Sequence, residues 1–191
     1  MRDAENIREV EALCIDLMGF IFWPKSSRYV SERPVYLPTR CKRVGVFVDE
    51  AANTIKKIAN DYALDYIQLH GSESPEYVQQ LHDWQVIKAF NIATTEDLKA
   101  VELYEGVVDY FLFDTKGRFV GGNGEKFDWS VLEAYHGDTP FLLSGGIGPD
   151  DAERVKAFHH PKCIGIDLNS KFEDEPALKN IQKLKTFIEQ L

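Results

Sequence analysis

The sequence predicts an α/β protein of the (β/α)8 TIM-barrel type, with parallel strands, in a single domain that covers residues 1–191. Seven strands are visible, and we expect the first β-strand of the barrel to be absent. Three observations predict the barrel fold. Short apolar runs recur with their first residues 20 to 31 positions apart. The intervals hold helical patterns, and polar or glycine residues follow almost every run, as in βα units.

The predicted strands are nearly continuous apolar runs, which indicates strands buried on both faces of a parallel sheet. Such a sheet is either doubly wound or closed into a barrel. The polar residues after the strands favour the barrel, because barrel enzymes build their sites there, and no GxGxxG follows a first strand. The seven runs are LMGFIF (17–22), RVGVFV (43–48), YIQLHG (66–71), VIKAF (86–90), YFLFDT (110–115), FLLSGG (141–146) and IGIDLNS (164–170).

Helical patterns fill the intervals between the runs. The sequence also opens in a helical pattern, with Asp3 or Asn6 as the expected N-cap before apolar Ile7, Val10 and Leu17. Since a barrel typically has about 250 residues and begins with a strand, we expect the missing element to be the first strand. The other predicted helices are 53–60, 75–82, 95–104, 150–158 and 176–191.

Composition excludes some classes of protein. The formal net charge is −9 and no basic stripe occurs, so we expect no nucleic-acid partner. No apolar stretch approaches the roughly 18 residues of a membrane span, which predicts a cytoplasmic protein without membrane association. The three cysteines, Cys14, Cys41 and Cys163, have no CxxC spacing, which argues against disulfides and a zinc site. We expect Cys14 to be buried on the first helix.

The segments that follow the strands resemble phosphoribosylanthranilate isomerases. These are GFIFWPKSSRYV, RVGVFVDE, IQLHGSESPEY, VIKAF, DYFLFDTKG with GGNGEKFDWSVL, FLLSGGIGPDDAERV and GIDLNSKFE with EPALKN, in that order over essentially the whole chain. The resemblance implies the Amadori rearrangement of N-(5-phosphoribosyl)anthranilate to 1-(2-carboxyphenylamino)-1-deoxyribulose 5-phosphate, in tryptophan biosynthesis. It implies no metal, no organic cofactor and a small-molecule substrate, with the protein a monomer or homodimer.

The catalytic residues follow from this resemblance. Ring opening needs a general acid, and the iminium that forms needs a general base to remove the C2′ proton. The family's acid is an aspartate at a strand end, matched here by Asp114, which without the resemblance could simply cap a loop. The family's base is a cysteine in a KxCG-like segment that would precede Met1. No cysteine of this chain matches it, so the resemblance predicts impaired activity.

Phosphate-binding residues are expected in the loops after the last two strands, where barrels often bind phosphate with backbone N–H groups. In SGGIG these are Gly145 and Gly146, which could otherwise form an ordinary tight turn. In NSKFE they are Asn169 and Ser170. This segment departs from the family pattern at Asn169 and at Lys171, which puts the phosphate contacts in doubt.

The remaining candidates bind the other end of the substrate or line its pocket. Arg28 matches the family arginine that binds the anthranilate carboxylate. A planar guanidinium suits this role because it can form two parallel hydrogen bonds with a carboxylate. We expect Gln68, His70, Lys88 and Asp167 to line the pocket, although Lys88 could be only a strand-end charge.

Two other functions stay open at this stage. One is a different phosphosugar-binding barrel isomerase, and the other is a non-catalytic fragment that binds anionic sugars. Near the end of the chain, EPALKN has Ala177 and Asn180 where the family usually has glycine and aspartate. We expect this change to alter the capping of the last helix more than the chemistry.

Overall fold

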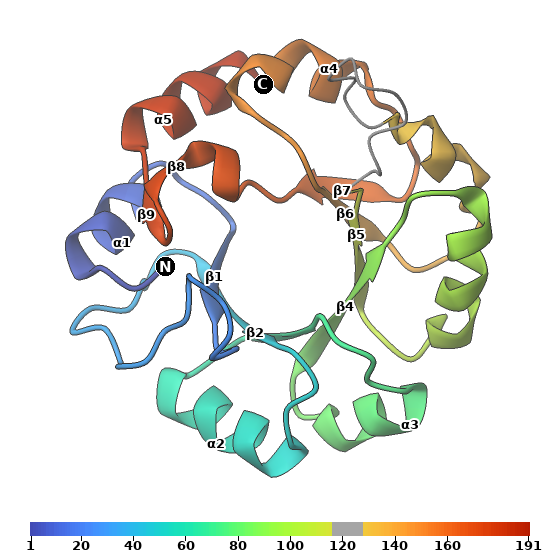
Figure 1. The fold of residues 1–191 in the computed structure, drawn as a ribbon, viewed down its shortest axis with the longest axis horizontal. Coiled ribbons are helices and arrows are strands. Elements are labelled where there is room, and N and C mark those ends of the chain that lie inside the picture. Colours follow the sequence, from blue (N-terminus) through green and yellow to red (C-terminus); the bar gives the residue numbers. More distant parts are fainter. Residues whose placement is uncertain (116–127) are drawn as a thin grey trace.

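The computed structural model describes residues 1–115 and 128–191. Seven parallel strands form one sheet in which each strand pairs with the next along the chain. The sheet curls, with strands on the inside and helices around them (Figure 1). All seven predicted runs are confirmed as strands: β1 (Leu17–Ile21), β2 (Lys42–Phe47), β3 (Tyr66–Leu69), β4 (Gln85–Asn91), β5 (Tyr110–Asp114), β6 (Phe141–Ser144) and β7 (Cys163–Ile166).

The helices of this chain are short. Thr95–Tyr104 is a 3-10 helix, η2, and the segment from residue 150 divides between η4 and α4. The others confirm the predicted positions within a few residues, except the last. The helical segments are α1 (Ala4–Glu11), α2 (Ala52–Tyr62), α3 (Pro75–Val78), η1 (Gln79–Leu81), η2, η3 (Trp129–Ala134), η4 (Pro149–Asp151), α4 (Ala152–Ala157), η5 (Ser170–Phe172) and α5 (Ile181–Gln190).

The final helix begins five residues later than predicted. A small antiparallel hairpin, β8 (Glu173–Glu175) and β9 (Leu178–Lys179), precedes it. The hairpin turns at Ala177, whose φ of 71° lies in the left-handed region. The Asn180 side chain accepts a hydrogen bond from the backbone N–H of Lys183 at 2.8 Å and caps α5. A helix cannot continue N-terminally through this cap and turn.

The first helix confirms one prediction and corrects another. Asp3 is the N-cap, and its side chain accepts from the backbone N–H of Asn6. However, the helix ends at Glu11, and Leu17 belongs to β1. Cys14 lies in the turn between them, exposed and at a φ of 59°. It is therefore not buried on a helix face, because the apolar periodicity that suggested this runs past the helix end.

Alternation along the strands sorts the core into two layers. Val44, Ile87, Ala89 and Leu112 form a cluster on one face of the sheet. The second cluster lies between the other face and the helices, and includes Phe20, Phe47, Phe111, Phe113 and Phe141, all fully buried. Each such side chain contributes roughly 1.5–3 kcal/mol relative to exposure. Side chains at strand ends follow the same alternation, which decides which face of the sheet each one occupies.

The two terminal strands of the sheet are β1 and β7. Within residues 1–115 and 128–191 no pairing joins them. The β8–β9 hairpin lies beside α1 (Figure 1), and two hydrogen bonds of 2.8 Å connect the Asn6 side chain to the backbone of Lys179. Arg2 also donates to the carbonyl of Pro176. The C-terminal hairpin thus holds the first helix in place.

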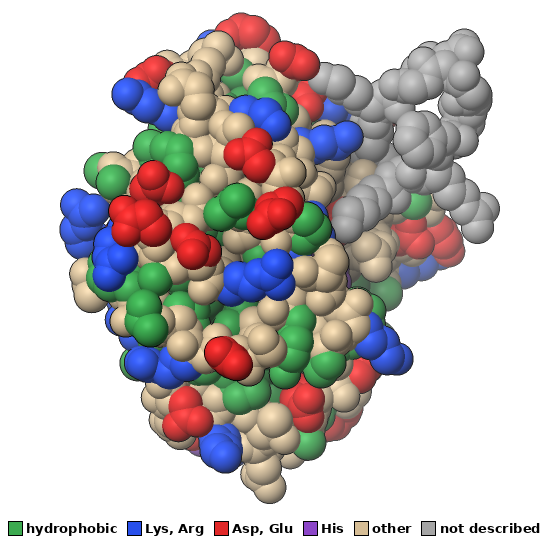
Figure 2. All heavy atoms as spheres, turned by 60° about the vertical axis from the view of Figure 1, so that its left-hand side comes forward, with side chains coloured by type: hydrophobic (Ala, Val, Ile, Leu, Met, Phe, Trp, Pro, Cys, Tyr) green, Lys and Arg blue, Asp and Glu red, His purple; other side chains and the backbone are tan. Residues whose placement is uncertain are grey.

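The outer surface mixes charges of both signs, and Figure 2 shows acidic and basic side chains interspersed on the face that it presents. No helix in the described part of the chain is long and apolar enough to cross a membrane. In the same residues, no group of three or more His, Cys, Asp and Glu side chains could hold a metal ion.

Candidate active site

Three polar side chains come together where β5, β6 and β7 end. Asp114 is the last residue of β5, is 3% exposed, and lies opposite Ser144 in the register of β5 with β6. The Ser144 hydroxyl donates to Asp167 Oδ2 at 2.8 Å. Of these, Asp114 and Asp167 were predicted site residues, whereas Ser144 was not, although it opens the SGGIG motif. Parallel strands place all three at one edge of the sheet, where barrel enzymes have their active sites.

Gly145 allows the loop after β6 to approach Asp114. Its φ is 92°, and a Cβ atom there would lie 2.6 Å from Asp114 Oδ1 and 2.5 Å from the backbone nitrogen of Thr115. No larger residue fits without moving the backbone. Gly146 also has a positive φ, of 70°, but a Cβ atom would meet nothing within 4 Å. Only Gly145 is therefore required for close packing, while Gly146 serves the turn.

A series of hydrogen bonds from Trp129 through Thr115 holds the start of this loop in place. The Thr115 hydroxyl donates to the carbonyl of Ser144 at 2.8 Å, and Trp129 Nε1 donates to the Thr115 hydroxyl at 3.2 Å. The Arg154 guanidinium lies 3.7 Å from the centroid of the Trp129 ring. No sequence motif predicted this support, because the hydrogen-bonded residues are 14 or more positions apart in the chain. The GGNGEKF part of the resemblance lies outside the described residues.

The second predicted phosphate segment follows β7. Asn169 directly precedes η5, and its side-chain oxygen accepts from Lys179 Nζ at 2.7 Å. Ser170 is the first residue of η5. The Lys171 side chain lies beside Gly148, since a Cβ atom on this glycine would be 3.7 Å from that of Lys171. The two loops predicted to bind phosphate are therefore neighbours.

Gln68 and His70 lie at the end of β3. The Gln68 amide nitrogen is 3.3 Å from His70 Nδ1, and the His70 backbone N–H donates to the carbonyl of Phe47. Gln68 alternates with the outward residues Ile67 and Leu69, so it shares the inner face with Asp114. The structure places these two predicted pocket residues on the same edge as the general-acid candidate.

Lys88 lies apart from this group. Its neighbours Ile87 and Ala89 belong to the inner cluster, whereas its ammonium lies near the rings of Phe90 and Tyr104 on the helix side. The ammonium donates to Glu73 Oε2 at 3.3 Å and to three backbone carbonyls, and only 3% of the side chain is exposed. Burial lowers the Lys88 pKa, and Glu73 opposes that shift. Lys88 is therefore a structural charge at the end of β4, on the opposite face of the sheet from Gln68. The prediction that Lys88 lines the pocket is corrected.

Arg28 lies in the loop after β1 and is held by a carboxylate of the C-terminal hairpin. Arg28 Nε donates to both oxygens of Glu173, at 2.8 and 3.0 Å, and Nη2 donates to one of them. Lys179 binds the same carboxylate at 2.9 Å. Burial tends to raise the Glu173 pKa, but hydrogen bonds from Arg28 and Lys179 outweigh it and hold the pKa below its ordinary value. The sequence predicted neither Glu173 as the partner of Arg28 nor the contact between Glu173 and Lys179.

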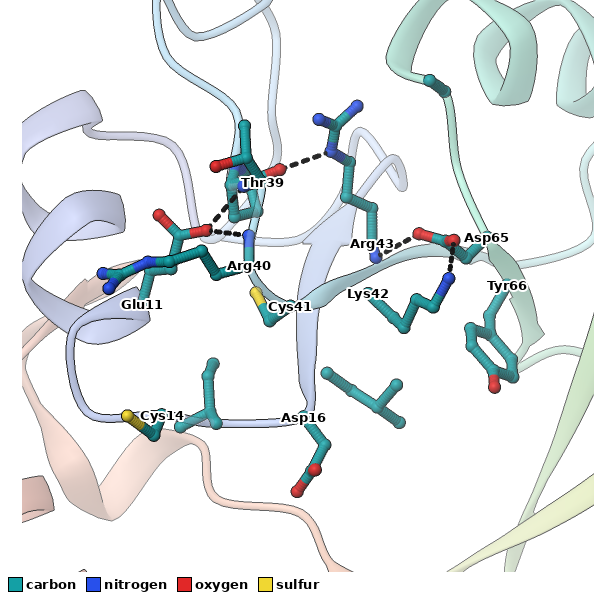
Figure 3. A pocket seen from close by; sticks show the side chains of 14 residues that line it. Glu11, Cys14, Asp16, Thr39, Arg40, Cys41, Lys42, Arg43, Asp65 and Tyr66 are labelled. Atoms are coloured by element: carbon teal, nitrogen blue, oxygen red, sulfur yellow. Dashed lines mark hydrogen bonds and ion pairs between the residues drawn. The ribbon is translucent and has the colours of Figure 1, made fainter.

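The opposite edge of the sheet has a pocket of a different kind. A hollow of about 730 Å³ lies at the amino ends of β1, β2 and β3 (Figure 3). Glu11 accepts hydrogen bonds there from Tyr36 and from the backbone of Thr39 and Arg40. Burial raises the pKa of the Cys41 thiol in this pocket to about 11. Such a thiol is a poor candidate for a base at neutral pH.

The curled parallel sheet and the polar edge around Asp114 define an α/β protein of the barrel-enzyme type. A family model described as N-(5'phosphoribosyl)anthranilate (PRA) isomerase matches residues 1–190. The chain is 51% identical to N-(5'-phosphoribosyl)anthranilate isomerase of Parabacteroides distasonis, over all of this chain and 90% of that protein. The chain therefore belongs to the N-(5'-phosphoribosyl)anthranilate isomerase family.

Solved structures agree with this membership. The phosphoribosyl anthranilate isomerase of Thermotoga maritima is similar with a TM-score of 0.84 and 30% identity, covering 100% of this chain and 94% of that one. A second isomerase structure has a TM-score of 0.79 and 28% identity, with 100% and 97% covered. That protein is in complex with reduced 1-(o-carboxyphenylamino)-1-deoxyribulose 5-phosphate.

Proposed function

We propose that this chain is a phosphoribosylanthranilate isomerase of tryptophan biosynthesis, with Asp114 as the general acid. The observation that carries the proposal is the burial of the Asp114 carboxyl at the end of β5, against Gly145 and next to the Ser144–Asp167 pair. Family membership supports the reaction, and the ligand of the related structure supports a small-molecule substrate.

In the proposed reaction, Asp114 gives a proton to the furanose oxygen as the ring C1′–O bond breaks. The nitrogen lone pair forms the C1′=N iminium, and a base then removes the C2′ proton to give an enolamine. Tautomerisation of the enolamine yields the ketose. We assign the anthranilate carboxylate to Arg28 and the phosphate to the loops that contain Gly145, Gly146, Asn169 and Ser170. Gln68, His70 and Asp167 line the pocket between them.

We further propose that the general base is a cysteine on a strand placed between β1 and β7, outside these residues. The positions of the three cysteines and the raised pKa of two of them support this. Cys14 is in the turn after α1, Cys41 precedes β2, and Cys163 opens β7, so none reaches the edge with Asp114. Burial raises the pKa of both Cys41 and Cys163. We therefore expect residues 1–191 by themselves to turn over slowly. We also propose a cytoplasmic monomer or homodimer.

The test is the decay of the anthranilate fluorescence of N-(5-phosphoribosyl)anthranilate on adding the 191-residue chain. Asp114→Asn is the matched background, and binding of the reduced product is measured in parallel. Binding with decay only at the Asp114→Asn rate supports an isomerase site that lacks its base. Decay well above that rate supports the reaction but refutes the absent cysteine as base. Failure to bind the reduced product contradicts the proposed function.

A further inference from the structure

The carboxylate of Glu173 is a buried centre of charge that the proposed reaction leaves unexplained. Only 4% of its side chain is exposed. It accepts from Arg28, from Lys179 Nζ at 2.9 Å and from the backbone N–H of Ala177 at 3.2 Å. A buried carboxylate is tolerated when cations and N–H groups satisfy its oxygens, and here they come from two distant parts of the chain.

The way in which Glu173 binds Arg28 leaves half of the guanidinium available. A guanidinium has two edges that can bind a carboxylate with two parallel hydrogen bonds. Glu173 takes the Nε–Nη2 edge. Among the described residues, Nη1 makes no hydrogen bond, and 24% of the Arg28 side chain is exposed compared with 4% for Glu173. The outer Nη1–Nη2 edge can thus accept a second carboxylate.

Lys179 fixes Glu173 independently of Arg28. Its ammonium spans Glu173 Oε1, at 2.9 Å, and Asn169 Oδ1, at 2.7 Å, which connects Glu173 to the loop after β7. The Asn6 side chain binds both the backbone N–H and the backbone carbonyl of Lys179. Two cations, Arg28 and Lys179, share the Glu173 carboxylate, and the charge of Asp167 also acts on Lys179.

We propose that Glu173, clamped by Lys179, is a positioning residue that aims the outer edge of Arg28 at the anthranilate carboxylate of the substrate. This inference rests on the proposed function and adds the group that makes Arg28 selective for a carboxylate. An Arg side chain that is free to rotate loses conformational entropy when it binds, and an Arg that is already held loses less. Glu173 does not touch the substrate itself.

The experiment compares the binding of two ligands to the 191-residue chain. Reduced 1-(o-carboxyphenylamino)-1-deoxyribulose 5-phosphate carries a carboxylate and a phosphate, whereas ribose 5-phosphate carries only the phosphate. We expect Glu173→Gln to weaken binding of the first by about tenfold and of the second by less than about twofold, as measured by calorimetry. In an Arg28→Met background, adding Glu173→Gln should change neither affinity by more than about twofold, because the group that Glu173 aims is gone.

Glu73→Gln is the matched control, because it removes the charge of an equally buried carboxylate that binds Lys88. It should lower the free energy of unfolding without changing the ratio of the two affinities. Equal weakening of both ligands by Glu173→Gln would mean a merely structural role and overturn the proposal. Tighter binding of the reduced product would mean that Glu173 competes for Arg28, which also overturns it. If the unaltered chain binds neither ligand, the proposed function itself fails.

Discussion

The two edges of the sheet use charged side chains in different ways. At the amino edge, Glu11 accepts from two backbone N–H groups (Figure 3), and Arg43 donates to the carbonyls of Pro38 and Tyr62. At the carboxyl edge, Ser144 binds Asp167 and Arg28 binds Glu173 through their side chains. Lys88, on the helix side of this edge, also donates to backbone carbonyls. A side-chain partner can change rotamer around a ligand, whereas a backbone partner moves only if the loop moves.

This difference separates stability from chemistry within one fold. In barrel enzymes the carboxyl edge carries catalysis and the amino edge contributes to stability. The comparison also explains why the hollow at the amino edge is not our candidate site. Its carboxylate and guanidinium groups already hold loops together, and the half-buried Cys41 thiol has a raised pKa. Substitutions at the two edges should therefore affect different measurements.

The largest effect on ligand binding should come from Gly145→Ala at the carboxyl edge. The new Cβ would lie within 2.6 Å of Asp114 Oδ1 and of the Thr115 backbone, so the loop or Asp114 must move. We expect the affinity for the reduced product to fall by about 100-fold, because both Asp114 and the adjacent loop that we propose binds phosphate are displaced. Calorimetric titration measures this.

Gly146→Ala is the control for Gly145→Ala, since it shares the positive φ but meets no atom within 4 Å. It should cost about 1–2 kcal/mol of stability from the backbone strain alone and weaken binding by less than about tenfold. Equal effects of the two substitutions would show that close packing against Asp114 is unimportant.

At the amino edge, Glu11→Ala should lower the free energy of unfolding by about 3 kcal/mol, because two backbone N–H groups and the Tyr36 hydroxyl lose their acceptor. Ligand affinity should stay within about twofold of the unaltered chain if the edges are independent. Urea unfolding and the same titration test both statements. A large loss of affinity would contradict the division between the edges.

The contribution of Glu11 to the free energy of unfolding should also depend on pH. Burial tends to raise its pKa, but hydrogen bonds from Tyr36, Arg40 and Thr39 outweigh it and lower the pKa below its ordinary value of 4.5. The contribution is therefore complete above that value and is lost as the pH falls through the lower, folded-state pKa. The stability difference from Glu11→Ala should narrow in that acid range, in unfolding curves recorded at several pH values.

The smallest expected effect is a gain, from Ala177→Gly in the β8–β9 turn. Ala177 has a φ of 71°, where glycine is free of the strain that a Cβ causes. We expect about 1 kcal/mol more stability, with affinity for the reduced product unchanged. Because the Ala177 backbone N–H binds Glu173, a change in affinity would mean that this turn adjusts the Arg28 cluster.

Much of the fold could be predicted because its signals are local. Each strand is an apolar run bounded by polar or turn-forming residues, and the seven runs became the seven strands. The position of Asp114 at the end of a strand could be predicted for the same reason, because it directly follows an apolar run. The prediction that Cys14 is buried was wrong, because the apolar periodicity does not show that the first helix ends after eight residues. The hairpin before α5 was missed because its turn uses an alanine rather than a glycine.

The sequence by itself determined the order and kind of the strands, the carboxyl edge as the candidate site, and membership of a family. Only the tertiary structure decided which charges meet. Arg28 and Glu173 are 145 positions apart, so no local pattern connects them. Lys88 looked like a pocket residue until strand alternation and Glu73 placed it on the helix side. Such pairings depend on how the sheet curls, since folding brings distant loops within the range of a hydrogen bond.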